Sequence, residues 1–408
     1  MRQGFFKKSE LLAMGKKPAT LTPRCETCRL YKGCLSPKMP ATGEGRLGVL
    51  IVAEAPGKTE DERNTQLIGK SGQRLRRTLN EIGIDLDEDC IKTNAIICRP
   101  PSNRTPSEDE LNYCRPHLVE TIEKYKPHLI ITLGATALYQ VIRPYWKDDF
   151  GEFERWVGWQ IPLQSLNTWI CPTWHPSYLE RDRNEVRDLW FKKHLQAAFA
   201  LKNRPWKTAP DYKSLVERVN SVVPIIEEMK NYDGMACFDY ECNMLKPDSE
   251  SSTLVSCSIT WGKGRAERCV AYPMTPENSI ATRQFLRSPI PKIGANIKFE
   301  ERWSVAKLRT RVRNWVWDTM QCTHVLDNRP KITSNDFQTF VRLGFPIYSS
   351  HISPLLKGKG KGGYTVNQIL TEISVPQLLL YNGLDTITEF ELAIRQMKEL
   401  GRKPPWKD

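Results

Sequence analysis

The sequence predicts two α/β domains, and three observations support that prediction. The chain has 408 residues, more than one ordinary hydrophobic core accommodates. Its first half alternates short aliphatic runs with amphipathic segments, a pattern typical of a parallel sheet covered by helices. Its second half places an acidic pair at the end of another apolar run. We expect domains at residues 1–204 and 214–408, joined by a linker at 205–213.

The charge balance points to a polyanionic partner. The chain holds 60 Lys and Arg against 47 Asp and Glu, a formal net charge of +13. Nucleic acid is the expected polyanion, because Lys and Arg contact its phosphates. We expect neither a signal peptide nor a membrane span, since the longest apolar stretch, Leu129 to Ile142, is short and interrupted. A cytoplasmic location is therefore predicted.

In a reducing compartment, the 12 cysteines of the chain indicate metal ligation rather than a disulfide framework. Cys25 and Cys28 form a C-x2-C pair, with Cys34 just beyond it. Cys98 and Cys114 follow far downstream, each directly before an Arg-Pro sequence. Tetrahedral zinc and a [4Fe–4S] cluster are both candidates, and the spacing does not separate them. Scattered free thiols remain the alternative.

Four apolar runs in the first half have the length and β-branched content of buried strands. They span residues 47–53, 90–97, 128–133 and 169–173. The first runs into Glu54, the second carries Asn94, and the fourth is followed by His175. Ligands of open α/β sheets bind at the carboxyl ends of strands, so these side chains are candidate site residues. A basic amphipathic helix is expected from Ser71 to Ile82.

These motifs resemble the family-four uracil-DNA glycosylases, the iron–sulfur branch of their superfamily. Glu54 to Gly57 fits the family's G-E-A-P-G, although Ala53 replaces the first glycine. Thr93-Asn94, followed by Cys98 to Arg104, fits T-N…C-R-P-P-x-N-R. His175 to Ser177 is the late H-P-S motif. The resemblance covers residues 25–201 and implies a parallel-sheet α/β domain of the glycosylase type.

The resemblance implies a structural [4Fe–4S] cluster on Cys25, Cys28, Cys98 and Cys114, with Cys34 left as a spare thiol or an alternative ligand.

It also implies a pocket that receives a uracil extruded from DNA. Asn94 would read the amide edge of the base, and His175 would stabilise negative charge on the O2 atom of the departing base. Glu54, helped by Asp61, would stabilise the cationic sugar and orient water.

One departure from the family concerns base stacking. The family usually has Pro-Phe before V-G-x-A-G, whereas Leu67 stands here before Ile68 and Gly69. Aromatic stacking on a base is worth about 1–3 kcal/mol, so affinity or base preference is expected to differ. Arg181 or Arg183 would fill the gap in the duplex or grip a phosphate. The alternative is a glycosylase fold kept for DNA binding or assembly.

In the second half, Asp239 and Glu241 lie two residues apart and point to one face of a strand. Neighbouring carboxylates repel unless a cation lies between them, and paired divalent ions drive phosphodiester hydrolysis. Two solvated acids are the alternative. Glu300 follows an N-x-K-F sequence, and Tyr381 and Asp385 share one face if their stretch is helical.

Residues 208–400 resemble the ribonuclease-H-like 3′–5′ proofreading exonuclease domain of family-A DNA polymerases. The resemblance implies that Asp239 bridges two Mg²⁺ or Mn²⁺ ions, with Glu241 and Asp385 completing their shells. Glu300, where the family usually has Asp, would act from one side, and Tyr381 would orient the attacking water.

Further elements are expected around these motifs. Asp318 is assigned a supporting role near the acidic site. Helical spacing from Leu215 to Met229 is expected to bend or break at Pro224. Strands are expected at 235–241 and 253–261. The basic glycine-rich loop 357–363 either touches a phosphate backbone or stays solvated.

The expected function is a uracil-DNA glycosylase module fused to an exonuclease, acting on uracil-containing DNA and single-stranded 3′ ends. No polymerising motif follows before Asp408, so a separate DNA polymerase subunit is the expected partner, in a bacterial or virus-infected cytoplasm. The alternatives are a stand-alone nuclease with a DNA-binding clamp, and a non-catalytic polymerase accessory subunit.

Overall fold

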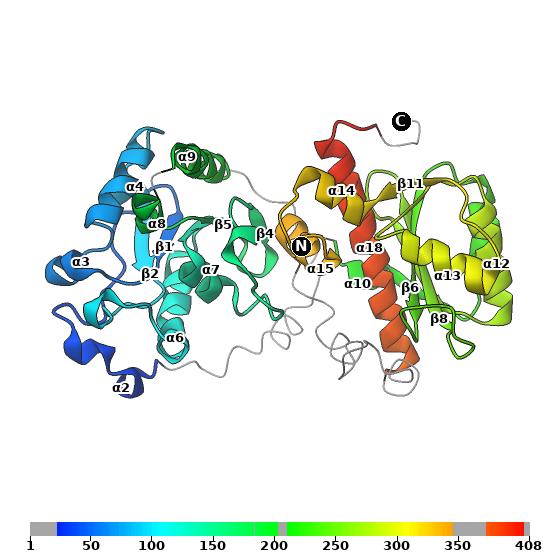
Figure 1. Cartoon of the computed structure of the whole chain (residues 1–408), viewed down its shortest axis with the longest axis horizontal. Coiled ribbons are helices and arrows are strands. Elements are labelled where there is room, and N and C mark those ends of the chain that lie inside the picture. The colour runs from blue at the N-terminus through cyan, green and yellow to red at the C-terminus, as the bar shows by residue number, and fades with distance from the viewer. Residues whose placement is uncertain (1–22, 183, 203–209, 346–372, 404–408) are drawn as a thin grey trace. The chain divides into compact units, whose positions relative to one another are not determined.

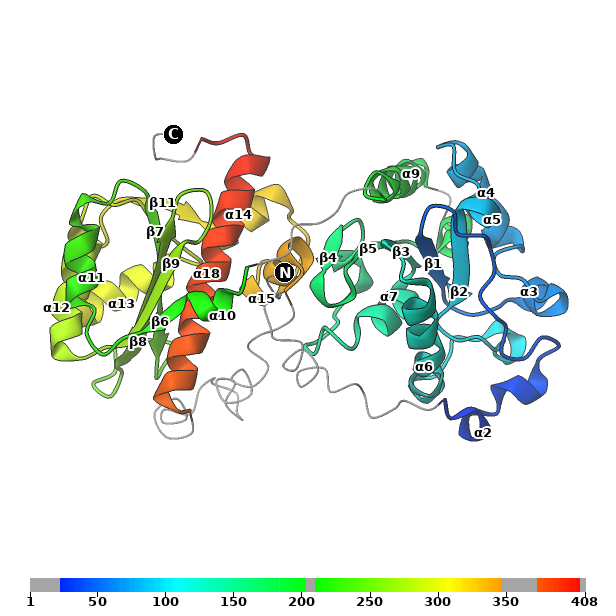
Figure 2. The ribbon, with the colours of Figure 1, turned by 180° about the vertical axis from the view of Figure 1, so that it is seen from behind.

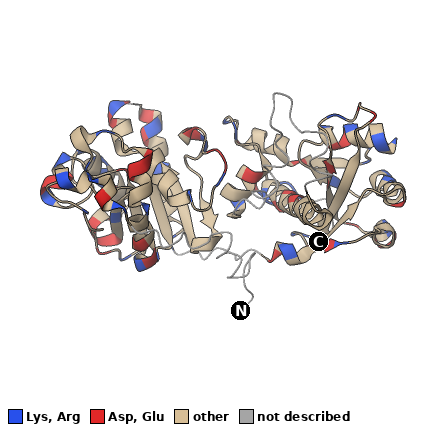
Figure 3. Ribbon diagram, turned by 90° about the horizontal axis from the view of Figure 1, so that it is seen from below, with Lys and Arg blue, Asp and Glu red and all other residues tan. Residues whose placement is uncertain are grey.

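The computed structural model describes residues 23–182, 184–202, 210–345 and 373–403. These residues form two compact units that divide near residue 208, each considered by itself below (Figures 1 and 2). Lys and Arg residues, coloured blue in Figure 3, are distributed over helices of both units. Arg183, the loop 357–363 and most of the expected linker lie outside the described residues.

The first unit is built on a five-stranded sheet in the order β2-β1-β3-β5-β4. Four strands are parallel, which confirms the predicted parallel α/β sheet, and the short edge strand β4 is antiparallel to β5. The strands are β1 (Val49–Ala53), β2 (Cys90–Asn94), β3 (Leu129–Leu133), β4 (Ile161–Leu163) and β5 (Thr168–Thr173). The second strand ends at Asn94 rather than at Ile97, because Ala95 to Ile97 leave the sheet and pack with Leu30 and Leu111.

Helices cover both faces of this sheet. Leu75 and Leu79 of α4 and Phe191 and Leu195 of α9 pack on one face, while α7 contacts β1 and β3. The helices are α2 (Cys25–Cys28), α3 (Lys58–Arg63), α4 (Lys70–Asn80), α5 (Leu86–Asp89), α6 (Glu108–Tyr125), α7 (Ala135–Ile142), α8 (Pro176–Arg181) and α9 (Glu185–Phe199), with short 3-10 turns η1 (Leu30–Gly33), η2 (Pro101–Asn103), η3 (Phe153–Arg155) and η4 (Gln164–Leu166).

The second unit is built on a six-stranded sheet in the order β11-β10-β7-β8-β9-β6. Among these strands, β8 alone runs against its neighbours. The strands are β6 (Val216–Arg218), β7 (Met235–Cys242), β8 (Leu254–Gly262), β9 (Arg268–Pro273), β10 (Lys292–Gly294) and β11 (Trp315–Asp318). The helices are α10 (Tyr212–Leu215), α11 (Val223–Glu228), α12 (Pro276–Arg287), α13 (Lys298–Leu308), α14 (Thr319–Leu326), α15 (Asn335–Gln338) and α18 (Val375–Glu399), with η5 (Met229–Asn231) and a π-turn η6 (Thr339–Leu343).

The helix expected from Leu215 to Met229 is found only in its second part, where α11 spans Val223–Glu228. Val216 instead begins strand β6, which pairs with β9 at the edge of the sheet. Pro224 lies in the first turn of α11, where a missing N–H costs no hydrogen bond, so it starts a helix instead of breaking one. The outer edge of a sheet can recruit a short strand that local spacing does not reveal.

The long helix α18 runs across the sheet and positions the acidic residues (Figure 1). It contacts β7, β8 and β9. Ser258 Oγ donates to the carbonyl of Asn382 at 2.7 Å, which ties the helix to β8. A Cβ at Gly383 would lie 2.5 Å from Val216 Cγ1, so the absent side chain allows the close approach. The predicted helical face shared by Tyr381 and Asp385 is thereby confirmed.

Successive side chains of β7 point alternately to the hydrophobic core and to the acidic residues beside α18. Phe238 and Tyr240 face the core cluster that includes Phe285 and Trp303 of α12 and α13. The intervening Asp239 faces α18, where Asn382 binds it. Among the described helices, none combines the length and the apolarity that a bilayer crossing requires.

Candidate active sites

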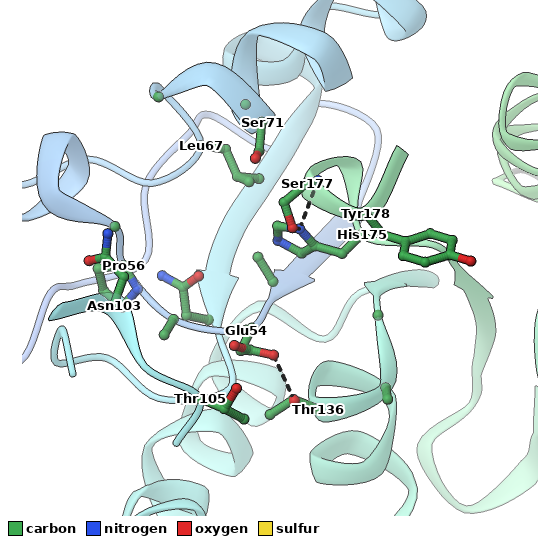
Figure 4. A pocket seen from close by; sticks show the side chains of 18 of the residues that line it. Glu54, Pro56, Leu67, Ser71, Asn103, Thr105, Thr136, His175, Ser177 and Tyr178 are labelled. Atoms are coloured by element: carbon green, nitrogen blue, oxygen red, sulfur yellow. Dashed lines mark hydrogen bonds between the residues drawn. The ribbon is translucent and has the colours of Figure 1, made fainter. Parts of the chain in front are cut away.

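A cleft of about 570 Å³ lies at the carboxyl ends of the parallel strands in the first unit (Figure 4). Glu54 follows β1, Asn94 ends β2, and His175 follows β5, and all three line the cleft. Leu67 and Arg181 line it as well. The structure thus brings five of the residues predicted for this site to one cleft, namely Glu54, Leu67, Asn94, His175 and Arg181.

Glu54 is held by the first turn of α7. Thr136 Oγ1 donates to Glu54 Oε2 at 2.8 Å (Figure 4). The register of β1 with β2 pairs Ala53 with Asn94. Glu54 is the next residue after Ala53, so it lies at the same end of the sheet as Asn94. Asn94 is only 3% exposed. A buried amide of this kind can match both a donor and an acceptor on a planar base.

His175 is held as a neutral donor. The Ser177 N–H donates to His175 Nδ1 at 3.1 Å, and Ser177 Oγ lies 2.7 Å from the same nitrogen (Figure 4). Burial, with a smaller effect from Arg181, lowers the pKa of His175 to about 4. The imidazole is therefore neutral at neutral pH. Because Nδ1 accepts a backbone N–H, the ring proton is assigned to Nε2, which can donate to an oxygen.

The loop before α4 gives the cleft an aliphatic wall. Leu67 is 6% exposed and has φ of 54°, a left-handed conformation that is uncommon for a non-glycine residue. A Cβ at Gly72 would overlap the carbonyl of Leu67, so only glycine allows this packing. Glu60 Oε1 accepts from the Gly69 N–H at 2.7 Å and closes the loop. Leu67 is thus a fixed part of the wall and offers no aromatic ring.

Asp61 does not line the cleft. It is buried and accepts from the N–H groups of Leu35 at 3.2 Å and Ser36 at 2.9 Å, so it holds that loop instead. The sequence reasoning missed Thr136 and Phe153, which do line the cleft. Thr136 could have been found, because it follows β3 at the same sheet edge as Glu54. Phe153 lies in a segment without periodicity that gives no signal.

Four cysteines line one small pocket of the first unit. They are the four expected ligands Cys25, Cys28, Cys98 and Cys114. The Lys38 N–H donates to Cys98 Sγ at 3.3 Å, and the Ile97 N–H donates to Cys114 Sγ at 3.4 Å. Backbone donors of this kind stabilise thiolates. Cys34 is not in the lining, and its thiol donates to the carbonyl of Leu30 at 3.2 Å.

The four thiols fit a bound cationic group. Burial raises the pKa of Cys98 to about 11 and that of Cys114 to about 12, so a cation is needed to hold them as thiolates. A cationic group bound by all four cysteines would supply that charge.

The second unit holds three carboxylates in one group. Oxygens of Asp239, Glu241 and Asp385 all lie within 4.8 Å of one another. They line a cleft of about 250 Å³ together with Tyr381. Asn382 Nδ2 donates to Asp239 Oδ2 at 2.8 Å and fixes one of the oxygens. Strand β7 and helix α18 therefore supply the group from both sides, as the predicted motifs require.

Burial dominates the electrostatics of this group. It raises the pKa of Asp239 to about 7, against opposing hydrogen bonds from the Tyr240 backbone and Asn382. Burial also raises the pKa of Glu241, and the charges of Asp239 and Asp385 raise it further. Buried carboxylates stay ionised only with cationic compensation. The donor set is all oxygen, which suits Mg²⁺ or Mn²⁺.

Glu300 lies behind Asp239 and not in the cleft. It is buried in the first turn of α13, and its Oε2 atom has no hydrogen-bond donor among the described residues. Burial raises its pKa, and the neighbouring Asp239 carboxylate adds to the effect. Two facing carboxyl groups require a shared proton or a cation between them. The orphaned oxygen therefore fits a site completed by a cation or by a proton.

Two further acids complete the surroundings. Asp318 accepts from the N–H groups of Asn296 and Ile297, each at 3.1 Å, and so holds the turn before α13. Glu389 lines the acidic cleft and accepts from Cys237 Sγ at 3.3 Å. The sequence reasoning missed Glu389, although it follows Asp385 by one helical turn and so shares its face.

The protein consists of two fused α/β modules, and each module has its own cleft lined by acidic and polar side chains. In the second unit, the strand order with only β8 reversed among the described strands is ribonuclease-H-like, which confirms the predicted fold class. In the first, residues 40–200 match the family model for the uracil DNA glycosylase superfamily. The type-4 uracil-DNA glycosylase of Pyrobaculum aerophilum is 35% identical over 164 residues, covering 40% of this chain and 82% of the relative. The chain belongs to the uracil-DNA glycosylase superfamily.

Similarity also extends beyond the first unit. A DNA polymerase of Bacillus phage SP01 is 25% identical over 319 residues, covering 71% of this chain and 34% of the polymerase. Among solved structures, Escherichia coli RNase D, an exoribonuclease, aligns at 12% identity with a TM-score of 0.36, covering 46% of this chain and 45% of that chain. The predicted resemblance of the first half is confirmed, and the second unit combines the ribonuclease-H-like strand order with sequence similarity to a phage DNA polymerase.

Proposed function

We propose that this chain is a DNA repair enzyme that excises uracil with its first unit and trims single-stranded 3′ ends with its second. The predicted boundaries 1–204, 205–213 and 214–408 are kept as part of the proposal. The observation that carries it is the convergence of Glu54, Asn94 and His175 on one cleft in a member of the glycosylase superfamily.

The cleft residues support a separate role for each side chain in base excision. Asn94 pairs with the amide edge of an extruded uracil. As the N-glycosidic bond breaks, its electron pair leaves with the base, and His175 Nε2–H donates to the O2 atom where negative charge develops. Glu54, oriented by Thr136, stabilises the cationic sugar and accepts a proton from the water that adds to it. Arg181, or Arg183 two residues further along the sequence, fills the gap left in the duplex or grips a phosphate.

Excision is tested with uracil-containing oligonucleotides, single- and double-stranded, followed by alkali to break abasic sites. We expect cleavage by the wild-type protein and a loss of at least about 100-fold in the Asn94→Ala variant, purified in parallel to control for contaminants. Absence of cleavage by clean, cluster-loaded wild-type protein would remove the glycosylase proposal and leave the DNA-binding clamp as the better account.

The four pocket cysteines are proposed to hold a [4Fe–4S] cluster. Cys25 and Cys28 come from α2, Cys98 follows β2, and Cys114 lies on α6, so a bound cluster would tie three segments together. Its role would be to stabilise the fold. Iron and zinc quantification with the visible absorbance of the purified protein tests the assignment. Zinc in place of iron would contradict it.

The acidic cleft supports a second proposed activity, 3′–5′ exonuclease action. Asp239, Glu241 and Asp385 would hold Mg²⁺ or Mn²⁺, which when bound supply charge stabilisation for in-line hydrolysis of a phosphodiester. Asn382 orients Asp239 for that task, and Tyr381, one helical turn before Asp385, orients the attacking water. Glu300, held behind Asp239, sets the position of that carboxylate.

The nuclease proposal is tested on a 5′-labelled single-stranded oligonucleotide with and without Mg²⁺. Asp239→Ala should abolish metal-dependent shortening from the 3′ end. Asp233→Ala is the matched control, because Asp233 is exposed, pairs with Lys263 at 2.8 Å and lies outside the cleft lining. Undiminished digestion by the Asp239 variant would sink the assignment.

A separate DNA polymerase remains the proposed partner. The 25% identical relative is a phage DNA polymerase, of which the chain covers only 34%. This similarity supports a protein that works together with a DNA polymerase. Co-purification of the full chain with a DNA polymerase that lacks its own exonuclease is the expected result. A monodisperse monomer whose activities ignore added polymerase would contradict the partnership.

A further inference from the structure

We propose that Phe153 supplies the aromatic face on which the extruded base stacks, in place of the ring missing at Leu67. This inference deepens the proposed glycosylase function and rests on it. Phe153 belongs to η3, in the segment between α7 and β4, and lines the same cleft as Asn94 and His175. Its side chain is half-buried, so part of the ring is accessible from the cleft.

The segment that carries Phe153 is rigidly supported. Trp156 is 0% exposed and stacks on Phe150 with 5.2 Å between ring centroids and 18° between planes. Trp146 packs edge-on against Trp156 at 5.2 Å. The Arg155 guanidinium lies over both indoles, at 5.6 and 5.2 Å from their centroids. A side chain held on such a support is pre-organised, so little conformational entropy is lost when a base contacts it.

The segment is also tied to the strand that positions His175. The Gly158 N–H donates to the carbonyl of Pro172 in β5 at 2.9 Å. Gly158 has φ of 80°, and a Cβ there would lie 2.7 Å from His194 Nε2. The close approach fixes the segment against β5 and α9. Phe153 is therefore placed relative to His175 by the backbone, not only by side-chain packing.

The other aromatic residues of the cleft have neighbours on their rings. Trp174 packs against His194 with 5.2 Å between ring centroids. Tyr178 is covered by the Arg187 guanidinium at 5.2 Å, and its side chain extends away from Glu54 in Figure 4. Within the described residues, no aromatic ring or cation packs on the ring of Phe153. Phe153 is the lining aromatic whose face is left for a ligand.

Stacking on Phe153 would raise the affinity of the cleft for an extruded base. Every base has a π-face, so the stacking contact contributes affinity with little sequence preference, while Asn94 reads the edge of the base. A loss of about 1–3 kcal/mol on removing a stacking ring corresponds to roughly 5- to 150-fold in kcat/KM. The contact should therefore appear in excision kinetics.

The test uses the full chain and three variants on a single-stranded uracil oligonucleotide. Phe153→Leu keeps apolar volume and removes the ring, Phe153→Trp keeps a ring, and Leu67→Phe combined with Phe153→Leu places a ring at position 67 of the same cleft. We expect kcat/KM to fall by about 5- to 150-fold in the first variant, to stay near the wild-type value in the second and to regain most of the loss in the third. Trp190→Ala, a 48% exposed aromatic outside the lining, is the matched control.

Thermal melting of each variant separates stacking from folding, and Phe153→Leu should melt within about 3 °C of the wild type. Wild-type excision with unchanged kcat/KM in Phe153→Leu would overturn the stacking role and leave the glycosylase proposal standing. Loss of excision in Phe153→Leu without recovery in either ring-bearing variant would also overturn it. Wild-type protein without excision overturns the proposed function itself, and this inference with it.

Discussion

His175 offers the sharpest prediction, because its environment fixes its protonation state. Burial lowers the pKa of His175 to about 4, and the Ser177 N–H occupies Nδ1. The residue should therefore act as a neutral donor through Nε2, and its contribution to excision should be constant between about pH 5 and pH 8. An imidazolium mechanism would instead require the rate to rise as the pH falls toward 4.

The loss of activity expected on removing the His175 donor follows from its role in binding a developing oxyanion. Loss of one donor to a developing oxyanion typically costs about 10²–10³ in kcat, which is about 2.7–4 kcal/mol in the barrier. We expect His175→Ala to lose activity by that factor at every pH between 5 and 8. Ser177→Ala is the matched control, since it keeps the backbone N–H that binds Nδ1 and should lose less than about tenfold.

The lowered pKa of His175 also determines whether stability rises or falls with pH. A histidine whose folded pKa of about 4 lies below the usual 6.5 binds fewer protons folded than unfolded, so stability rises with pH across that window and is lost as the pH falls through it. A difference of one pKa unit between the folded and unfolded states corresponds to about 1.36 kcal/mol, so the free energy of unfolding changes by about 3 kcal/mol at most across this pH range. Denaturant unfolding at pH 4.5 and 7 measures it. A His175→Ala variant whose loss of rate varies with pH between 5 and 8, or whose stability keeps the wild-type pH dependence, would refute the reasoning.

Further predictions concern other parts of the chain. Asp239→Asn should raise the melting temperature of the chelator-treated protein, because burial raises the pKa of Asp239 and the neutral amide relieves repulsion with Glu241; a lower melting temperature would contradict this. Gly383→Ala should cost about 1–3 kcal/mol in urea unfolding, because the added Cβ meets Val216. Cys114→Ser should abolish the expected iron content and lower protease resistance, while Cys34→Ser should keep both.

Much of the site could be predicted from the sequence because parallel strands deliver their carboxyl ends to one edge. Glu54, Asn94 and His175 each follow or end an apolar run, so their convergence needed only the sheet. The pairing of Tyr381 with Asp385 needed only a helix. Local periodicity, together with motif order, was sufficient for these elements.

Other features depend on contacts that periodicity does not encode. Val216 to Arg218 form a strand only because β9 offers a free edge, and the same residues fit a helical spacing equally well. Asp61 has the charge expected of a catalytic helper but binds the backbone of Ser36. Phe153 reaches the cleft because Gly158 and the surrounding indoles fold its segment back onto β5. Such placements follow from tertiary packing alone.

The position of Glu300 shows how a one-carbon change can alter a site without removing its charge. With Glu rather than Asp at this position, the carboxyl group is buried against Asp239 and leaves Oε2 without a donor. A shorter side chain would withdraw the oxygen from Asp239 by about one bond length, about 1.5 Å. Glu300→Asp should therefore change the metal concentration needed for half-maximal digestion, measured for Mg²⁺ and Mn²⁺ separately. Identical metal dependence in both proteins would mean that Glu300 acts only through packing.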